Sequence, residues 1–184
     1  MIRIAVAVVF LAFPSTVVAQ VARLDIRYVE VDVSKMHKTT DEYLANLKKA
    51  REKSDAEAIF SLTKGFFQST REQSVSITRD VQGAMSLDEY GNGELRRGQG
   101  SGSESLQLNA TCQGRKGEIL DVTISCESAP GRDHFVRATS LGLRTEQFAE
   151  TIHFPVDVNS EGPGDAATRC VGIFIVKLTT TLSE

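Results

Sequence analysis

The sequence predicts an α+β fold that is mostly β, in which one or two helices pack on a single mixed or antiparallel sheet. Three observations support this fold class. Residues 106–112 and 120–126 alternate apolar and polar side chains, the period of half-buried strands. Residues 40–53 carry apolar side chains at helical spacing. Residues 80–105 are rich in glycine, serine and charged residues, which predicts a long loop.

The first residues, up to Ala19, have the three parts of a secretory signal peptide. Arg3 supplies the positive charge, residues 4–13 form an apolar run, and Val17 and Ala19 precede the expected cut before Gln20. The run is shorter than the roughly 20 apolar residues that span a bilayer. We therefore expect an exported bacterial protein of the periplasm or outer membrane. The alternative is an uncleaved N-terminal anchor.

The composition after cleavage suits one ordinary domain of about 165 residues. Loss of Arg3 leaves 20 basic against 24 acidic residues, a formal net charge of −4. This balance argues against a nucleic acid or an anionic membrane surface as partner. Tryptophan is absent, which makes a carbohydrate or stacking site less expected. No later window is long and apolar enough to span a membrane.

The chain then begins with a predicted strand over residues 21–33. Its apolar side chains change phase midway, which predicts either a bulge or a strand buried on both faces in turn. Thr39 and Glu42 have the spacing of a capping box, so we predict a helix over residues 40–53. The apolar stripe of this helix is Tyr43, Leu44, Leu47 and Ala50. Its basic residues are interpreted as a solvated face, with partner binding as the alternative.

The next segment admits two interpretations. Ser54 and Glu57 could cap a second helical turn. Residues 58–63 suit a strand equally well. We prefer the strand, because Thr63 and Gly65 do not favour continuation of a helix.

The middle of the chain changes character. Residues 74–79 alternate cleanly and predict a strand. Residues 80–105 are interpreted as a flexible loop rich in glycine and serine, because a loop this long in a compact domain is either functional or disordered. No Gly-Lys-Ser/Thr pattern follows a strand there, so a phosphate-binding loop is not predicted.

Residues 105–128 predict an antiparallel hairpin with its tip at Gly114–Gly117. This hairpin constrains the cysteines. If Cys112 faces Leu120, Cys126 lies about 20 Å away along the strand, beyond the about 7 Å between Cα atoms that a disulfide allows. Either Cys170 pairs with one of the two, or all three are buried thiols, and we favour buried thiols.

The remaining segments complete a count of about seven or eight strands. Residues 127–133 predict a turn and residues 135–138 a short strand. Residues 142–157 supply further apolar positions, and residues 159–167 a second loop. The last predicted strand, residues 170–178, is apolar in both phases, so it should lie centrally in a sheet.

Several of these segments, taken in order, resemble the β-domain of the secretins, the outer-membrane ring proteins of bacterial type II and III secretion systems. The segments are Leu24–Asp32, 42–53, 58–63, Leu106–Thr111 with its mate Ile119–Ser125, 142–145, 150–157 and Ile173–Val176. The resemblance would cover residues 20–184. It implies a non-enzymatic envelope module that acts through protein–protein assembly or self-association, with type II/III-like protein secretion as its setting. The sequence lacks the family's Val-Pro-x-Leu-Gly segment, its preceding periplasmic domains and a lipid-facing band. We therefore expect a standalone module and no membrane pore.

No catalytic, cofactor or metal site is predicted, and the binding residues stay unknown. The histidines lack partners at metal-ligand spacing: His37, His134 and His153. Asp133 and His134 beside Ser128 or Ser140 suggest a hydrolase triad, but no Gly-x-Ser-x-Gly elbow accompanies them. We therefore interpret His134 as a surface histidine. The alternative to an assembly module is a small soluble periplasmic binding module, suggested by the glycine-rich loop; any small-molecule ligand is unknown.

Overall fold

The computed structural model describes residues 20–100, 105–115, 119–128, 135–161 and 168–182. These residues form eight strands, two α-helices and one short 3₁₀ turn. In chain order the elements are β1 (Gln20–Asp32), α1 (His37–Glu52), α2 (Ala56–Glu72), β2 (Ile77–Leu87), β3 (Gly93–Gln99), β4 (Leu106–Arg115), β5 (Ile119–Ser128), β6 (Val136–Arg144), the turn Thr145–Gln147, β7 (Thr151–Glu161) and β8 (Thr168–Leu182).

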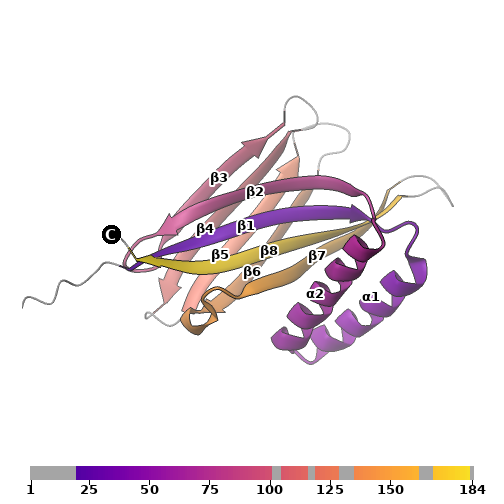
Figure 1. Cartoon of the computed structure of the whole chain (residues 1–184), viewed down its shortest axis with the longest axis horizontal. Helices are drawn as coiled ribbons and strands as arrows, with labels where there is room; N and C mark the ends of the chain where they lie inside the picture. Colours follow the sequence, from indigo (N-terminus) through magenta and orange to yellow (C-terminus); the bar gives the residue numbers. More distant parts are fainter. Residues whose placement is uncertain (1–19, 101–104, 116–118, 129–134, 162–167, 183–184) are drawn as a thin grey trace, which may run out of the picture.

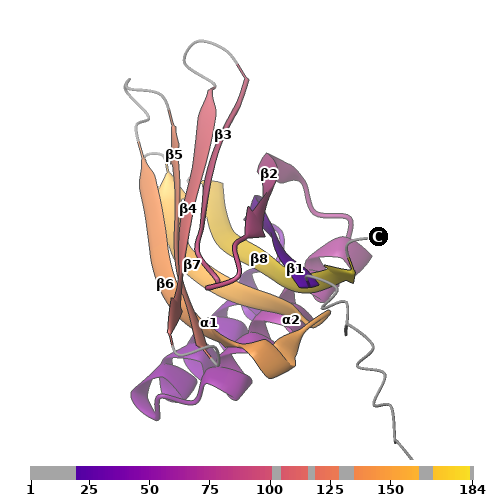
Figure 2. The same ribbon diagram turned by 90° about the vertical axis from the view of Figure 1, so that its left-hand side faces the viewer.

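The strands form two stacked antiparallel sheets. Sheet A has the order β2-β1-β8-β7, and sheet B has the order β3-β4-β5-β6 (Figures 1 and 2). The α+β, mostly β class is confirmed. The structure has two sheets where the sequence predicted one, because the chain passes from sheet A to sheet B after β2 and returns after β6. Each sheet buries one face against the other.

The main core lies between the two sheets. Its fully buried members include Leu24, Ile26 and Tyr28 from β1 and Leu108 and Ile124 from the hairpin. These side chains belong to the inward phase of alternating strands. The apolar rows that predicted the hairpin therefore face sheet A.

A second core lies between the helices and one half of the outer face of sheet A (Figure 1). Val29 and Val31 of β1 pack there against Leu47 of α1 and Phe66 of α2. The phase change in the first strand is thus explained: its first half is buried by sheet B, and its second half is also buried by the helices. A register shift against β2 occurs between Glu30 and Val31.

The helical hairpin corrects two predictions. The strand predicted over residues 58–63 is wrong, because these residues belong to α2. Its buried positions fall on one helical face: Ile59, Thr63, Phe66, Phe67 and Thr70. Asp55, rather than Ser54, caps the helix by accepting a hydrogen bond from the backbone N–H of Ala58 at 2.9 Å. The first helix begins at His37 after Met36, with no side-chain cap, so the Thr39–Glu42 capping box is wrong.

The long loop predicted over residues 80–105 is mostly wrong, because most of these residues belong to strands. Residues up to Leu87 continue β2, and Gly93–Gln99 form β3. Between them Asp88 turns the chain, accepting hydrogen bonds from the backbone N–H groups of Tyr90 and Asn92 at 2.9 and 2.7 Å. Residues 101–104 lie outside the described part. The sequence did not predict β3, because this outer strand consists mainly of exposed glycines and charged residues and contributes only Leu95 to the core.

The hairpin of β4 and β5 is confirmed, with a register two residues from the one assumed. Cys112 faces Val122, and Cys126 faces Leu108. The two cysteines are therefore four positions apart along the ladder, about 14 Å. Cys112, Cys126 and Cys170 are buried thiols. The tip residues 116–118 and the following turn at 129–134 lie outside the described residues.

The last two predicted strands are present, and both are longer than expected. The short strand expected at residues 135–138 is the longer β6. The last strand, β8, lies between β1 and β7, so its central position is confirmed. In the part of the chain that the structure describes, neither helix is long and apolar enough to cross a membrane.

Candidate functional site

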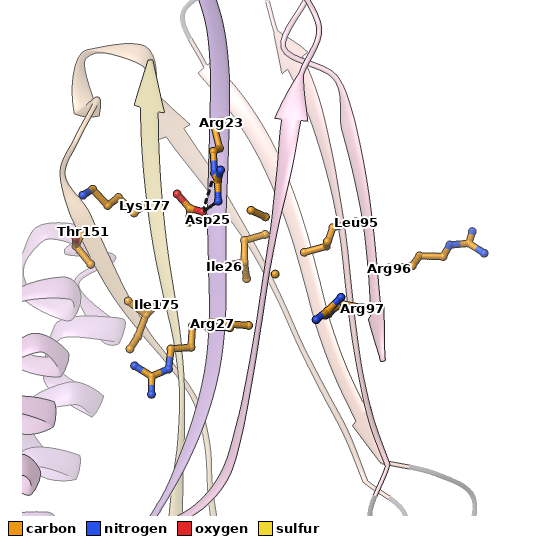
Figure 3. A pocket seen from close by; sticks show the side chains of 13 residues that line it. Arg23, Asp25, Ile26, Arg27, Leu95, Arg96, Arg97, Thr151, Ile175 and Lys177 are labelled. Carbon is orange, nitrogen blue, oxygen red and sulfur yellow. Dashed lines mark hydrogen bonds and ion pairs between the residues drawn. The ribbon is translucent and has the colours of Figure 1, made fainter. Parts of the chain in front are cut away.

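An open groove of about 620 Å³ lies on sheet A and reaches across to β3 (Figure 3). Its volume is within the range of ligand-binding pockets, about 300–1,000 Å³. Strands β1, β2, β3, β7 and β8 all contribute to its lining. The charged side chains among the lining residues are five cations and one carboxylate: Arg23, Arg27, Arg96, Arg97, Lys177 and Asp25. We call this the basic groove.

The strand register produces the main wall of the basic groove. Asp25 is directly opposite Ala84 on one side and Lys177 on the other, and Lys177 is opposite Thr151. These four residues therefore form one row across the outer face of sheet A. Arg27 belongs to the next row along β1. The helices cover this face only from Val29 onward, so the wall remains open to solvent.

The cations of the groove differ in their partners. Arg23 donates to Asp25 at 2.9 Å, and the Arg27 guanidinium donates to Asp80 at 2.7 Å. Arg96 donates to Glu94 at 2.7 Å and points away from the other labelled side chains (Figure 3). Within the described residues, Arg97 and Lys177 have no ion-pair partner. The side chains in the three pairs are at least 38% exposed, so these pairs are weak and exchangeable.

The groove also has an apolar part and no aromatic lining residue among those described. Ile26 and Leu95 lie at the boundary with β3 but are only 1% and 8% exposed, so Ile175 of sheet A supplies the accessible apolar side chain. Gly83 permits the close approach of β3, because a Cβ atom there would meet the side chain of Leu95 at 2.9 Å. Arg97 lies beside this contact. The groove therefore offers charge and shallow apolar contact but no surface for base or sugar stacking.

The outer strands offer a second kind of binding surface. A strand at the edge of a sheet presents unpaired backbone N–H and C=O groups. On β3 this edge carries the exposed charges Glu94, Arg96 and Arg97, which oppose pairing. On β6 the residues from Ala138 to Leu143 carry no charge, and Val136 is 51% exposed. Figure 2 shows β6 at the side of sheet B opposite β3. We call this boundary the β6 edge.

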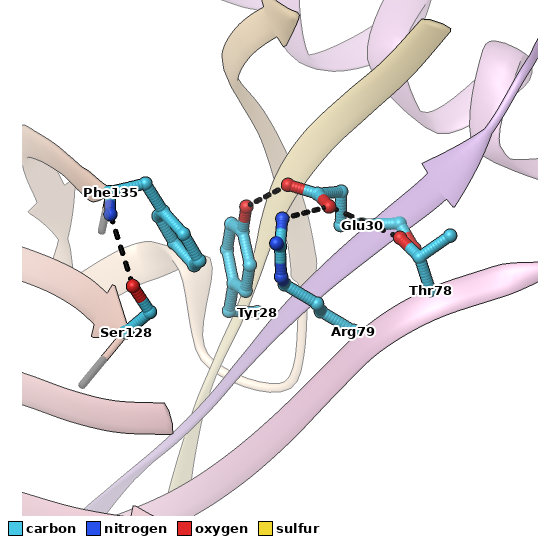
Figure 4. Close-up of polar contacts among 6 residues, drawn as sticks. All are labelled: Tyr28, Glu30, Thr78, Arg79, Ser128 and Phe135. Carbon is cyan, nitrogen blue, oxygen red and sulfur yellow. Dashed lines mark hydrogen bonds and ion pairs between the residues drawn. The ribbon is translucent and has the colours of Figure 1, made fainter. Parts of the chain in front are cut away.

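A polar cluster is buried where β1 and β2 approach the end of β5 (Figure 4). The Glu30 carboxylate accepts hydrogen bonds from Tyr28 at 3.0 Å and Thr78 at 3.1 Å, and it pairs with Arg79. Arg79 also lies 4.5 Å from the ring centroid of Phe135. The side chain of Glu30 is only 4% exposed, so this cluster joins the sheets rather than forming an open site.

The buried phenol of Tyr28 and the thiols of Cys112 and Cys126 stay protonated at neutral pH. Burial, followed by the charge of Glu30, raises the pKa of the Tyr28 hydroxyl far above its usual range. Burial also raises the pKa of Cys126 to about 12 and that of Cys112 to about 11. Because the thiolate is the reactive form, these cysteines are poor nucleophiles.

The residues considered for chemistry do not assemble into a described site. Ser128 accepts a hydrogen bond from the backbone N–H of Phe135 at 3.0 Å, and Ser140 is bonded to Thr123 at 3.1 Å. Asp133 and His134 lie outside the described residues. The pKa of His153 is lowered by burial and by the nearby Lys64. Within the described ranges, no group of three His, Cys, Asp or Glu residues could hold a metal ion.

The sequence contained a partial signal for the basic groove. Arg23, Asp25 and Arg27 alternate with the core residues of a predicted strand. Alternation therefore predicts that the three charged side chains share the face opposite the core. The contribution of Arg97 was missed because no strand was expected there. Lys177 was placed on a strand, but its position beside Asp25 depends on long-range pairing.

The chain matches no protein-family model, no curated protein and no solved structure. The basic groove and the strand edges are therefore the features from which we infer a function.

Proposed function

We propose that this chain is an exported, non-enzymatic module of the bacterial cell envelope that acts through protein–protein assembly. The observation that carries the proposal is the β6 edge: a nine-residue outer strand with an uncharged stretch. Such an edge can pair with another strand through backbone hydrogen bonds. The secretin resemblance suggests the same mode of action, with type II/III-like protein secretion as its setting.

The β6 edge is compatible with pairing to a second copy. In an antiparallel pair of β6 strands centred on Ser140, Arg137 would lie opposite Leu143, and Arg144 opposite Val136. No like charges would then face each other directly. The charges on β3 would oppose the corresponding use of the other edge of sheet B.

Light scattering across a range of protein concentrations tests this proposal. We expect a mass above that of the monomer, and we expect the double variant Ala138→Lys/Ser140→Lys to shift the protein to monomer. The added like charges would meet across the paired edges. We expect the dissociation midpoint to rise about tenfold or more.

The matched control is Gln107→Lys/Thr111→Lys, which adds the same charge at exposed positions of β4, inside sheet B. This variant should assemble as the unmodified chain does. A strictly monomeric mass at all concentrations would contradict the proposal. Equal dissociation by both variants would show contact through the face of sheet B instead of its edge.

A second candidate function is favoured by the basic groove. The chain would then be a small periplasmic binding module without a pore or secretion role. The groove's open wall supports this candidate, as do Arg97 and Lys177, which have no ion-pair partner among the described residues.

A further inference from the structure

We infer that the basic groove binds an extended, acidic segment of a partner protein. This inference rests on the second candidate function and does not depend on pairing of the β6 edge. The first reason is charge. The groove is lined by five cations and one carboxylate, Asp25, and Asp80 and Glu94 neutralise two of these cations from beside it. Five positive against three negative charges leave a local excess of two, although the whole chain has a formal net charge of −3. A local excess of positive charge on an acidic chain attracts anionic ligands.

The second reason is that two of the cations can bind a ligand without first losing a carboxylate partner. Arg97 and Lys177 have no ion-pair partner within the described residues. Arg23 and Arg27 have carboxylate partners, but these side chains are 54% and 38% exposed. An incoming carboxylate can therefore bind the first two directly and share the second two at low cost.

The third reason is size. The row from Thr151 through Lys177 and Asp25 to Ala84 crosses four strands, a span of about 14 Å at the usual strand spacing. Lys177 lies on β8 within this row, and Arg97 lies beyond its β2 end, on β3. One carboxylate cannot reach both cations, whereas an extended polypeptide of about four to six residues can.

The fourth reason is the chemistry that the groove lacks. Its described lining contains no aromatic side chain, so it has no platform for the stacked bases of a single-stranded nucleic acid. The cations line a recess whose accessible apolar side chain is the half-buried Ile175. A recess suits a narrow chain better than the flat surface of an anionic membrane. Carboxylates alternating with small apolar side chains match both the cations and the apolar part.

Fluorescence anisotropy with labelled octapeptides tests the inference at low salt. The probes are an alternating Glu-Val peptide and Gln-Val and Lys-Val peptides of the same length. We expect the Glu-Val peptide to bind best. We expect Arg97→Gln/Lys177→Gln to weaken its binding about tenfold. The Arg97→Lys variant should retain most of the binding, because it keeps the charge.

The matched control is Lys64→Gln/Arg71→Gln, which removes the same charge from exposed positions of α2. It should change binding less than about twofold. Equal binding of the Gln-Val peptide, or equal losses in both double variants, would overturn the inference. Tighter binding of anionic vesicles or single-stranded DNA by the groove would also overturn it in favour of those ligands.

The variant Ala138→Lys/Ser140→Lys separates this inference from the assembly proposal. It should bind the Glu-Val peptide as the unmodified chain does. Normal assembly without peptide binding would remove the groove inference alone. Peptide binding by a chain that never assembles would remove the assembly proposal alone.

Discussion

At the scale of single residues, the Glu30–Arg79 pair is the most buried ion pair in the described structure. Glu30 is almost completely buried, and Arg79 is 22% exposed. Removing charges from water is costly, and their attraction offsets this only when the remaining hydrogen-bonding capacity is used. Tyr28 and Thr78 use it here by donating to the carboxylate. The sequence does not distinguish Glu30 from a solvent-exposed acid, because the residues that bury Glu30 belong to β2 and sheet B.

We predict that Arg79→Met lowers the free energy of unfolding by about 3 kcal/mol, because it leaves a buried carboxylate without its cation. Urea denaturation measures this loss. The control is Arg27→Met, whose partner pair is 38% and 39% exposed and should contribute no more than about 1 kcal/mol. In Glu30→Gln/Arg79→Met the loss should be smaller than the sum of the single losses. Equal losses for Arg79→Met and Arg27→Met would contradict this account.

At the scale of elements, the helical hairpin shows how a local signal can be misinterpreted. Ile59, Phe66 and Phe67 satisfy a helical period over the full length of α2. A short window over residues 58–63 cannot reveal that period. The tertiary structure then outweighs the low helix propensities of Thr63 and Gly65, because the apolar face packs on sheet A. Thr63 also donates to the backbone C=O of Ile59 at 2.7 Å, which satisfies its hydroxyl within the helix.

We predict that Asp55→Ala lowers the free energy of unfolding by about 1 kcal/mol, because the N–H of Ala58 loses its acceptor. Asp55→Asn keeps a side-chain acceptor at the same position. It should therefore cost only a few tenths of a kcal/mol. Urea denaturation followed by circular dichroism compares the two variants. Equal losses in both would indicate that charge, rather than the cap hydrogen bond, is responsible.

At the scale of the whole molecule, the two sheets are joined where the Asp88–Asn92 turn packs on β4. A Cβ atom added to Gly114 would overlap the carbonyl oxygen of Tyr90. Gly91 has a positive φ of 82° in the same turn, a conformation that glycine adopts readily. Glycine at these positions therefore sets how closely the β2–β3 connection approaches sheet B.

We predict that Gly114→Ala lowers the free energy of unfolding by about 2 kcal/mol or more, because backbone must move to admit the methyl group. The control is Gly98→Ala on the neighbouring β3, where an added Cβ would meet nothing within 4 Å. It should change stability by less than about 0.5 kcal/mol. Thermal unfolding of both variants provides the comparison. Similar stability of the two variants would show that the turn does not constrain the joint between the sheets.

The sequence by itself determined the elements whose pattern is local. Alternation predicted the β4–β5 hairpin, the first strand and the central last strand, and the mostly β class followed from them. The tertiary structure decided the division into two sheets, the helical state of residues 58–63 and the strand at Gly93–Gln99. It also decided the basic groove, because Lys177 and Asp25 are 152 residues apart in the chain and become neighbours only through the β1–β8 pairing. Periodicity within one segment specifies which face is apolar. Only packing specifies what covers that face and which distant charges meet on the face left open.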